Sequence, residues 1–167
     1  MNVSGSDIGH SGFAQRVTRA LVAARLKPEL LTLELTENTL MERHGGAVQR
    51  LDDLRAIGVG LSVDDFGTGY SSLSYLSSLP IDSLKIDASF VRAMQVGSKE
   101  AEIVRAIVSL GASLGKRVIA EGIEDDSQLA QLRDMGCESG QGFHLSRPMA
   151  PYEIDGLLDG IEARTVH

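Results

Sequence analysis

A repeated order of helix, glycine and strand constrains this chain more than any other feature. Three times, a helical stripe of apolar residues ends at a glycine, and a strand begins within a few residues of it. These glycines are Gly58, Gly115 and Gly136, and the strands predicted after them cover 59–64, 117–121 and 137–141. Such alternation is typical of parallel βα units, because a parallel connection needs a long crossover that a helix supplies. We therefore predict an α/β fold with a parallel sheet.

The remaining elements are predicted from spacing. Leu31, Leu33 and Leu35 alternate with polar residues, which indicates a strand over 30–36 with one apolar face. A short strand is expected over 83–86. Apolar residues at helical spacing predict helices over about 13–26, 48–57, 103–114 and 129–135, and a last helix that starts near Pro151. Because no linker or low-complexity segment divides the chain, we expect a single domain over 1–167.

Charge and cysteine content exclude several classes of protein. The 167 residues carry 16 basic and 23 acidic side chains, a formal net charge of -7, which disfavours nonspecific binding to DNA or to anionic membranes. Cys137 is the only cysteine, so an internal disulfide cannot form. No apolar run approaches the roughly 18 residues of a membrane span, and the N-terminus has no signal-peptide core. We expect a cytoplasmic protein without membrane insertion and without a DNA partner.

Polar side chains recur near the carboxyl ends of the predicted strands, where chemistry collects in parallel βα folds. Counting in steps of two along each strand places one polar group per strand on a common face: Glu34, Asp64, Lys85, Glu121 and Gln141. Aliphatic residues such as Leu33 and Val63 face the other way, as expected if that face packs against outer helices. We therefore expect the five polar side chains to converge.

Asp64 and Asp65 are adjacent at the end of an apolar strand and lead into a glycine-containing loop. Adjacent carboxylates raise each other's pKa unless a cation lies between them or one is protonated. Carboxylate and amide oxygens suit Mg²⁺ or Mn²⁺, and no Cys or His cluster indicates zinc. Two such ions could polarise a phosphodiester and generate hydroxide. The alternative is that the pair serves turn and helix-cap chemistry.

Five blocks of this sequence resemble the signature of the EAL family, which comprises bacterial cyclic di-GMP phosphodiesterase domains. The blocks occur in the family's order: 33–37, 64–72, 85–87, 120–124 and 141–143. The resemblance runs from Asn2 to about Pro148. It implies a modified TIM barrel that hydrolyses cyclic di-GMP to linear pGpG with Mg²⁺ or Mn²⁺, held as a pair of ions.

The resemblance also implies roles for individual residues. The implied metal ligands are Asn2, Glu34, Asp64, Asp65 and Glu121. Glu121 is also similar to the family's general base, Lys85 to the lysine that orients the attacking water or contacts the phosphate, and Gln141 to a glutamine that lines the site.

A second set of family positions concerns the loop after Asp65. Glu37 and Glu124 are similar to residues that steady this loop and support the site. The loop residues are Phe66, Gly67, Thr68 and Gly69, in a segment that continues to Leu73. In the family, this segment links dimerisation to metal binding.

The chain departs from the family pattern at its start. It lacks the Glu-Ala-Leu block, whose glutamate is a metal ligand, and the nearby arginine that holds the substrate phosphate. The family has two strands and a helix before the point at which this chain begins. We therefore expect an N-terminally truncated barrel with about six of the eight strands. Because an open barrel exposes strand edges, we also expect a homodimer, a strand-exchanged oligomer or completion by another chain.

Each functional assignment has a structural alternative. Glu34 could face solvent, Glu121 and Glu124 could favour a helix start, and Gln141 could bridge backbone groups. For the chain as a whole, metal-dependent hydrolysis of cyclic di-GMP is the leading hypothesis. A catalytically silent receptor or protein-interaction module is the second, motivated by the missing glutamate. An unrelated metal phosphatase on the same scaffold is the third.

Overall fold

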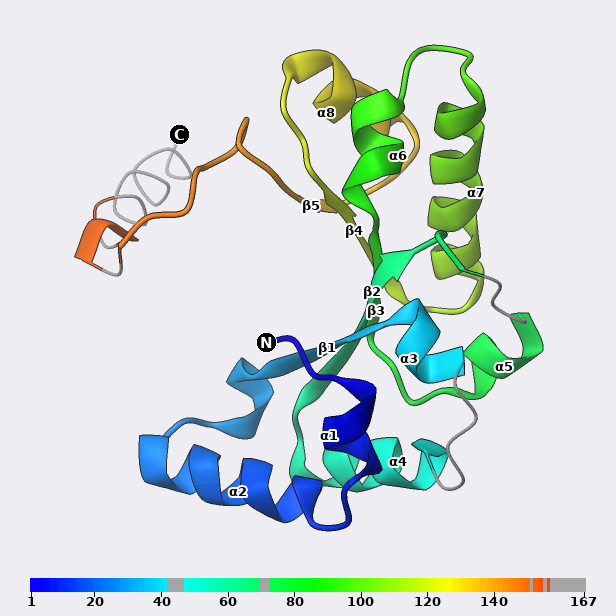
Figure 1. Cartoon of the computed structure of the whole chain (residues 1–167). Helices are drawn as coiled ribbons and strands as arrows, with labels where there is room; N and C mark the ends of the chain where they lie inside the picture. The colour runs from blue at the N-terminus through cyan, green and yellow to red at the C-terminus, as the bar shows by residue number, and fades with distance from the viewer. Residues whose placement is uncertain (42–46, 70–72, 151, 155, 157–167) are drawn as a thin grey trace.

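A five-stranded parallel sheet forms the centre of the protein (Figure 1). A computed structural model describes residues 1–41, 47–69, 73–150, 152–154 and 156. The strands are β1 (Thr32–Thr36), β2 (Gly60–Phe66), β3 (Ser83–Ile86), β4 (Arg117–Glu121) and β5 (Ser139–Gln141), and they lie side by side in sequence order. Sequential parallel strands of this kind are the arrangement found in βα barrels. The predicted α/β fold with a parallel sheet is confirmed.

The N-terminal residues lie along the free side of β1. Asn2 forms an isolated parallel bridge with Glu34, and the Glu34 amide donates a 2.8 Å hydrogen bond to the Met1 carbonyl oxygen. About six strands were expected; within the described part of the chain there are five strands and this bridge. The described sheet is open, with β5 at its other edge.

Two helices precede β1, and the others occupy the connections between strands. The helices are α1 (Gly5–Gly9), α2 (Phe13–Ala24), α3 (Glu37–Met41), α4 (Ala47–Ile57), α5 (Leu73–Ser78), α6 (Ala88–Ala93), α7 (Lys99–Ser113) and α8 (Asp126–Asp134), with a 3₁₀ turn, η1, at Pro28–Leu30. None of the helices in the described ranges has the length and apolar character required to cross a bilayer.

Local capping explains where the observed elements differ from the predicted ones. α2 ends before 26 because Arg25 adopts a left-handed conformation with φ 52°. α7 begins at Lys99 rather than near 103, because the Ser98 side chain accepts a hydrogen bond from the Ala101 amide. β1 starts at Thr32 because the preceding residues form η1. The helix predicted near Pro151 falls largely outside the described residues.

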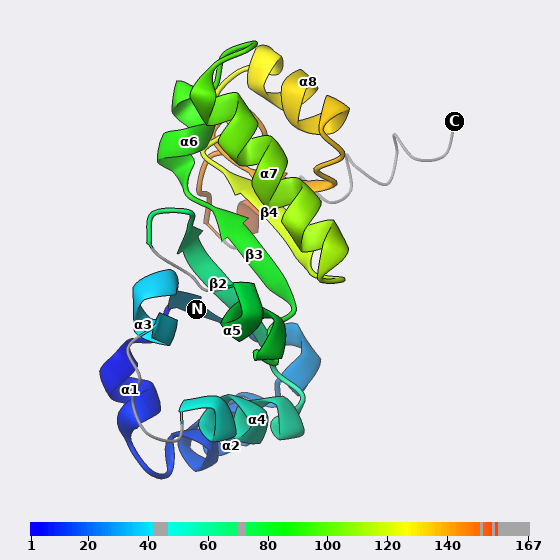
Figure 2. The same cartoon turned by 90° about the vertical axis from the view of Figure 1, so that its right-hand side faces the viewer.

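The two faces of the sheet differ as the alternation predicts. Leu33, Leu35, Leu61 and Val63 are fully buried and belong to one hydrophobic cluster with residues of α4 and α7. α4 packs on β2, and α7 packs on β3 and β4 (Figure 2). Burial of each such aliphatic side chain stabilises the fold by about 1.5–3 kcal/mol. The opposite face is left to the polar side chains.

We predict that Gly111→Ala destabilises the fold by about 1–3 kcal/mol, the range for overpacked cores. A Cβ at Gly111 would lie 2.1 Å from Val118 Cγ2, so α7 would have to move away from β4. Denaturant unfolding measures the change. Gly9→Ala is the matched control, because a Cβ there meets no atom within 4 Å. Equal stability of the two variants would contradict this packing.

Candidate functional site

Lys85 lies at the centre of three carboxylates that come from three different strands. Its Nζ lies 3.1 Å from Glu34 Oε1 on β1, 3.0 Å from Asp64 Oδ1 on β2 and 2.5 Å from Glu121 Oε1 on β4. The Lys85 residue is only 5% exposed. Gln141 on β5 joins the group, since its Nε2 donates a 2.8 Å hydrogen bond to Glu121 Oε1. The structure therefore brings five of the predicted site residues together.

Strand register produces this convergence. Thr36 pairs with Asp64, Lys85 with Ile119, and Glu121 with Gln141, so the polar residues stand near the carboxyl ends of their strands. One step towards the amino ends, the buried Ser83 hydroxyl donates to the Ser62 hydroxyl at 2.8 Å. The polar face is therefore hydrogen-bonded below the carboxylates as well as at their level.

Asp64 has a buried oxygen that is poorly satisfied. Its Oδ1 has no hydrogen-bond partner of good geometry among the described residues, although Lys85 Nζ is 3.0 Å away. The contact is therefore an ion pair without a well-aligned hydrogen bond. An orphaned buried carboxylate oxygen costs free energy unless a cation or donor reaches it.

The pKa values of the cluster reflect one cation shared among several acids. Burial lowers the pKa of Lys85, but its close contacts with the Glu121, Asp64 and Glu34 carboxylates outweigh burial and raise that pKa above its usual range. Burial raises the pKa of Glu121, and the nearby Asp64 and Glu34 charges add to this, against the lowering effect of Lys85. The ammonium therefore stays charged, while the carboxylates compete for it.

Asp65 points to a different partner. The register between β2 and β3 shifts after Val63, and Asp65 adopts a left-handed conformation with φ 53°. Burial raises the pKa of Asp65, with further raising effects from the Asp64 charge and from Asp87. Asp87 caps α6 by accepting from the Ser89 amide at 2.9 Å. The two adjacent acids thus serve two environments, and Asp65 is set apart from the Lys85 cluster.

Glu37 holds the loop after β2. This side chain is only 2% exposed, and its Oε2 accepts hydrogen bonds from the Gly67 amide at 3.0 Å and the Gly69 amide at 3.1 Å. Gly67 has φ 102°, and a Cβ there would lie 3.0 Å from a ring carbon of Phe90. A glycine is therefore needed where the loop turns. Residues 70–72 of the same motif lie outside the described residues.

Asn2 and Glu124 lie at the margins of the cluster. Asn2 is exposed, and its main chain is placed beside Glu34 by the bridge to β1. Glu124 is also exposed, and its Oε1 accepts a 2.9 Å hydrogen bond from Arg92 Nε on α6. The bonds described for Glu124 therefore tie the segment after β4 to α6, whereas the loop after β2 is held by Glu37.

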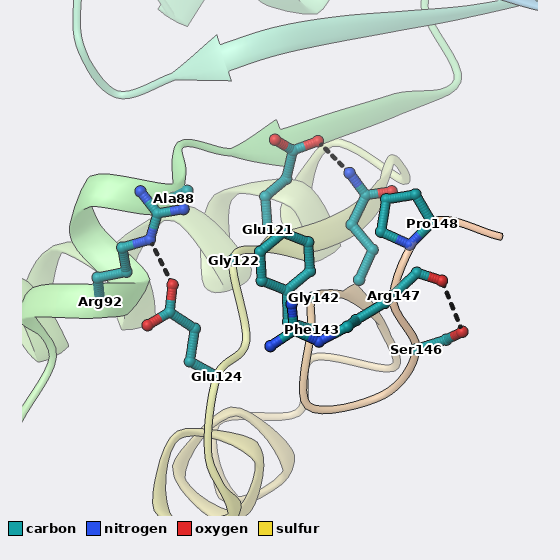
Figure 3. Close-up of a pocket in the computed structure, with 11 residues that line it drawn as sticks. Ala88, Arg92, Glu121, Gly122, Glu124, Gly142, Phe143, Ser146, Arg147 and Pro148 are labelled. Carbon is teal, nitrogen blue, oxygen red and sulfur yellow. Dashed lines mark hydrogen bonds and ion pairs between the residues drawn. The ribbon is translucent and has the colours of Figure 1, made fainter.

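A cavity of about 440 Å³ adjoins the cluster and shares Glu121 and Gln141 with it (Figure 3). Its volume lies within the range of about 300–1,000 Å³ typical of small-molecule sites. The Arg147 guanidinium carbon lies 5.1 Å from the centroid of the Phe143 ring, and Phe143 is 56% exposed. The other lining residues are Ala88, Arg92, Gly122, Glu124, Gly142, Ser146 and Pro148. The cavity thus offers an aromatic surface and two arginines beside the acids.

Close backbone contact forms one wall of this cavity. A Cβ at Gly142 would lie 2.1 Å from the Ile123 carbonyl oxygen, so only glycine allows the segment after β5 to lie against the segment after β4. The His144 amide donates to that same oxygen at 3.0 Å. These contacts position Phe143 and Arg147.

Sequence reasoning did not identify Asp87, Arg92, Phe143 or Arg147 as site residues. Asp87 has a signal in the sequence, because an Asp that ends a strand and is followed by Ala-Ser is typical of a helix N-cap. Arg92 and Arg147 have no comparable signal, since they reach the cavity through a helix surface and a loop. Phe143 falls in the sequence block 141–143, but its position in that block does not predict where its ring lies.

The donor set fits a hard divalent cation. Carboxylate oxygens of Glu34, Asp64 and Glu121 lie together, and Asp64 Oδ1 lacks an aligned donor. Within the described ranges, no group of three or more His, Cys, Asp or Glu side chains has its ligand atoms arranged to hold a metal ion. One oxygen of each of the three carboxylates contacts Lys85 Nζ instead.

Comparisons with known proteins cover most of the chain. A family model described as "EAL domain" matches residues 1–148. The chain is 46% identical over 154 residues to a bifunctional diguanylate cyclase/cyclic di-GMP phosphodiesterase, MucR of Pseudomonas aeruginosa, covering 92% of this chain and 22% of MucR. It is 43% identical to the cyclic di-GMP phosphodiesterase NbdA of the same organism, covering 95% of this chain and 20% of NbdA. The chain therefore spans about a fifth of the length of these relatives.

Solved structures agree with the sequence relatives. A complex of the P. aeruginosa MucR phosphodiesterase with cyclic di-GMP superposes with a TM-score of 0.86 at 44% identity, covering 92% of this chain and 68% of that one. A manganese and cyclic di-GMP complex of Klebsiella pneumoniae BlrP1 gives a TM-score of 0.78 at 33% identity, covering 86% and 37%. BlrP1 has also been solved with calcium and cyclic di-GMP. On these grounds, this chain belongs to the EAL domain family.

Proposed function

We propose that this chain provides the catalytic surface of a metal-dependent phosphodiesterase that hydrolyses cyclic di-GMP to linear pGpG. The observation that carries the proposal is the meeting of Glu34, Asp64 and Glu121 around Lys85, beside a cavity large enough for a small-molecule ligand. The relatives named as cyclic di-GMP phosphodiesterases support the substrate.

Oxygen ligands from several strands would hold the metal ions. Glu34, Asp64 and Glu121 have carboxylates at the cluster, Asp65 is next to it in the chain, and Asn2 lies beside β1. We propose these five as ligands of Mg²⁺ or Mn²⁺, bound as a pair. When bound, such ions supply a Lewis acid that polarises the phosphodiester and lowers the pKa of an attacking water. The manganese complex of BlrP1 supports this choice of metal.

The protein's own groups would then move protons and position the substrate. Lys85 and Gln141 both contact Oε1 of Glu121, so neither of these bonds engages Oε2. A raised pKa favours Glu121 as the acceptor of a proton from the attacking water. The water oxygen would bond to phosphorus as its proton passes to Glu121. The bond from phosphorus to the 3′ oxygen would break, and that oxygen would take up a proton from solvent and leave as a hydroxyl. The Lys85 ammonium provides positive charge beside the phosphate.

The neighbouring cavity supplies a place for one guanine base. The Phe143 ring is exposed and lies under Arg147, which is the kind of surface on which a nucleobase stacks. Arg92 and Arg147 provide positive charge for a second phosphate in a chain whose net charge is otherwise negative. Gln141 connects this cavity to Glu121 and thus to the reacting phosphate.

A silent receptor is the second candidate function. It is favoured by one observation: Lys85 Nζ holds the centre of the cluster, with the three carboxylates turned towards it. Such a site could bind cyclic di-GMP through the adjacent cavity without loading metal. Measurement of turnover separates the two functions, because a receptor binds the dinucleotide and forms no pGpG.

We predict that the chain with Mn²⁺ converts cyclic di-GMP to pGpG, and that Glu34→Gln lowers kcat/KM by at least about 100-fold. Loss of a ligand charge should cost no less than loss of an outer-shell partner, which costs about 10–100-fold. Chromatography of the nucleotides measures both rates. The matched control is Glu29→Gln on η1, an exposed glutamate remote from the cluster by its place in the fold. Calorimetric binding of cyclic di-GMP without turnover would instead establish the receptor.

We predict that Phe143→Ala raises KM for cyclic di-GMP about tenfold and changes kcat by less than about threefold. Stacking of one base is worth about 1–3 kcal/mol. The ion pairs and the hydrogen bond described for the carboxylate cluster do not involve Phe143. Steady-state kinetics measures the two constants. Val96→Ala, at an exposed apolar residue between α6 and α7, should leave both unchanged. A KM equal to that of the unaltered chain would contradict the placement of the guanine base in this cavity.

We predict that the chain self-associates at micromolar concentration. In the described part of the chain, β5 pairs only with β4, so one of its sides is an exposed strand edge. Exposed edges pair readily with further strands, which gives a homodimer or strand-exchanged oligomer. Light scattering measures the molar mass. A well-folded monomer over this concentration range would contradict the prediction.

A further inference from the structure

Under the proposed function, on which this inference rests, Lys85 and a divalent cation would need the same carboxylate oxygens. Lys85 Nζ has three N–H groups and three carboxylate neighbours, at 3.1, 3.0 and 2.5 Å. The three acids belong to β1, β2 and β4, so the ammonium on β3 connects the sheet across its polar face. A buried cation in such a position stabilises the carboxylates that surround it.

These contacts already engage carboxylate oxygens that a metal ion would use as ligands. Glu34 Oε1, Asp64 Oδ1 and Glu121 Oε1 all face Nζ, and in the described ranges no three acidic or other ligand side chains are arranged to chelate an ion. A divalent cation that takes up these oxygens must share them with the ammonium or displace it. Since two positive charges a few ångströms apart repel each other, the two states compete.

The cluster is not neutral, so it can attract a further cation. Three formal negative charges face one positive charge, so the cluster retains negative charge with Lys85 in place. Asp64 Oδ1 is poorly satisfied, because it is buried and has no aligned hydrogen-bond donor among the described residues. The cluster is therefore stabilised by Lys85 but incompletely neutralised by it.

We propose that Lys85 is a resident counter-cation that holds the carboxylates together before metal loading and lowers the affinity of the site for divalent cations. Of the two outcomes, sharing or displacement, we assign displacement: metal binding moves the Lys85 side chain away from the centre of the cluster. Once displaced, the ammonium is free to face the substrate phosphate. Metal loading and positioning of Lys85 are thus a single coupled change.

The test compares Lys85→Met with the unaltered chain in Mn²⁺ titrations followed by the electron paramagnetic resonance of free Mn²⁺. We expect Lys85→Met to bind Mn²⁺ at least about tenfold more tightly, because the competing charge is gone. With a chelator present, its melting temperature should fall below that of the unaltered chain, and Mn²⁺ should raise it by more. Affinity that is unchanged or weaker in Lys85→Met would overturn the proposal.

Lys116→Met is the matched control, since it removes the same charge from the same side-chain shape. Lys116 is half-buried, and its Nζ donates a 2.7 Å hydrogen bond to the Ile81 carbonyl oxygen rather than to a carboxylate. Its Mn²⁺ affinity should stay within about twofold of the unaltered chain. An equal gain in both lysine variants would show a general charge effect and overturn the specific role of Lys85.

A second measurement needs no variant to fold without metal. In the unaltered chain, isotope-labelled lysine Cε and Nζ resonances report on their surroundings during titration with diamagnetic Mg²⁺. The Lys85 resonance should shift at saturation and the Lys116 resonance should not; a stationary Lys85 resonance would overturn the displacement. If the unaltered chain bound neither Mn²⁺ nor Mg²⁺, the proposed metal-dependent function would fail. Binding without a gain in Lys85→Met would remove only this inference.

Discussion

One buried ammonium and its carboxylates determine how the polar face of this sheet can be built. Lys85 is charged and almost fully buried, which is tolerable only because three acids reach it from neighbouring strands. Those acids can reach it only in the observed parallel register, since a slip of one residue would turn each side chain to the opposite face. The packing of Leu33, Leu61 and their neighbours against the helices fixes that register. The apolar core and the ionic cluster therefore specify the same alignment of strands.

The loop after β2 shows how the chain separates two adjacent acids that would otherwise repel each other. Asp64 continues the strand alternation and faces Lys85, whereas Asp65 takes a left-handed conformation and is coupled to Asp87. Conformations of this kind persist only where neighbouring contacts enforce them. Glu37 supplies such contacts through the Gly67 and Gly69 amides. The strain at Asp65 is thus offset by a buried carboxylate at the carboxyl end of the neighbouring strand.

Much of this arrangement was predictable from sequence, and the reason is periodicity. Alternation in steps of two is a property of any strand, so the sequence alone predicts that Glu34, Lys85 and Glu121 lie on one face. The departure at Asp65 was not predictable, because a register shift depends on the partner strand.

The cavity lined by Phe143 and Arg147 was not predictable from the sequence either. Its wall depends on a contact between Gly142 and Ile123, which meet only when β4 and β5 pair. Element ends also shifted, since capping by Ser98 and the turn at Arg25 are local effects that override helical spacing.

The unequal charge of the cluster connects its stability to its chemistry. If the acids around Lys85 were fully neutralised by it, the site would be a structural ion pair and would have little affinity for a further cation. Instead, Glu121 has a raised pKa and Asp64 Oδ1 lacks an aligned donor, so the negative charge is held in place without being cancelled. Under the proposed function, this remaining negative charge is what draws a divalent cation to the site, because the folded sheet already holds the acids together. In that proposal, the lysine that stabilises the folded sheet also limits how tightly a metal binds, so folding and metal affinity oppose each other at one side chain.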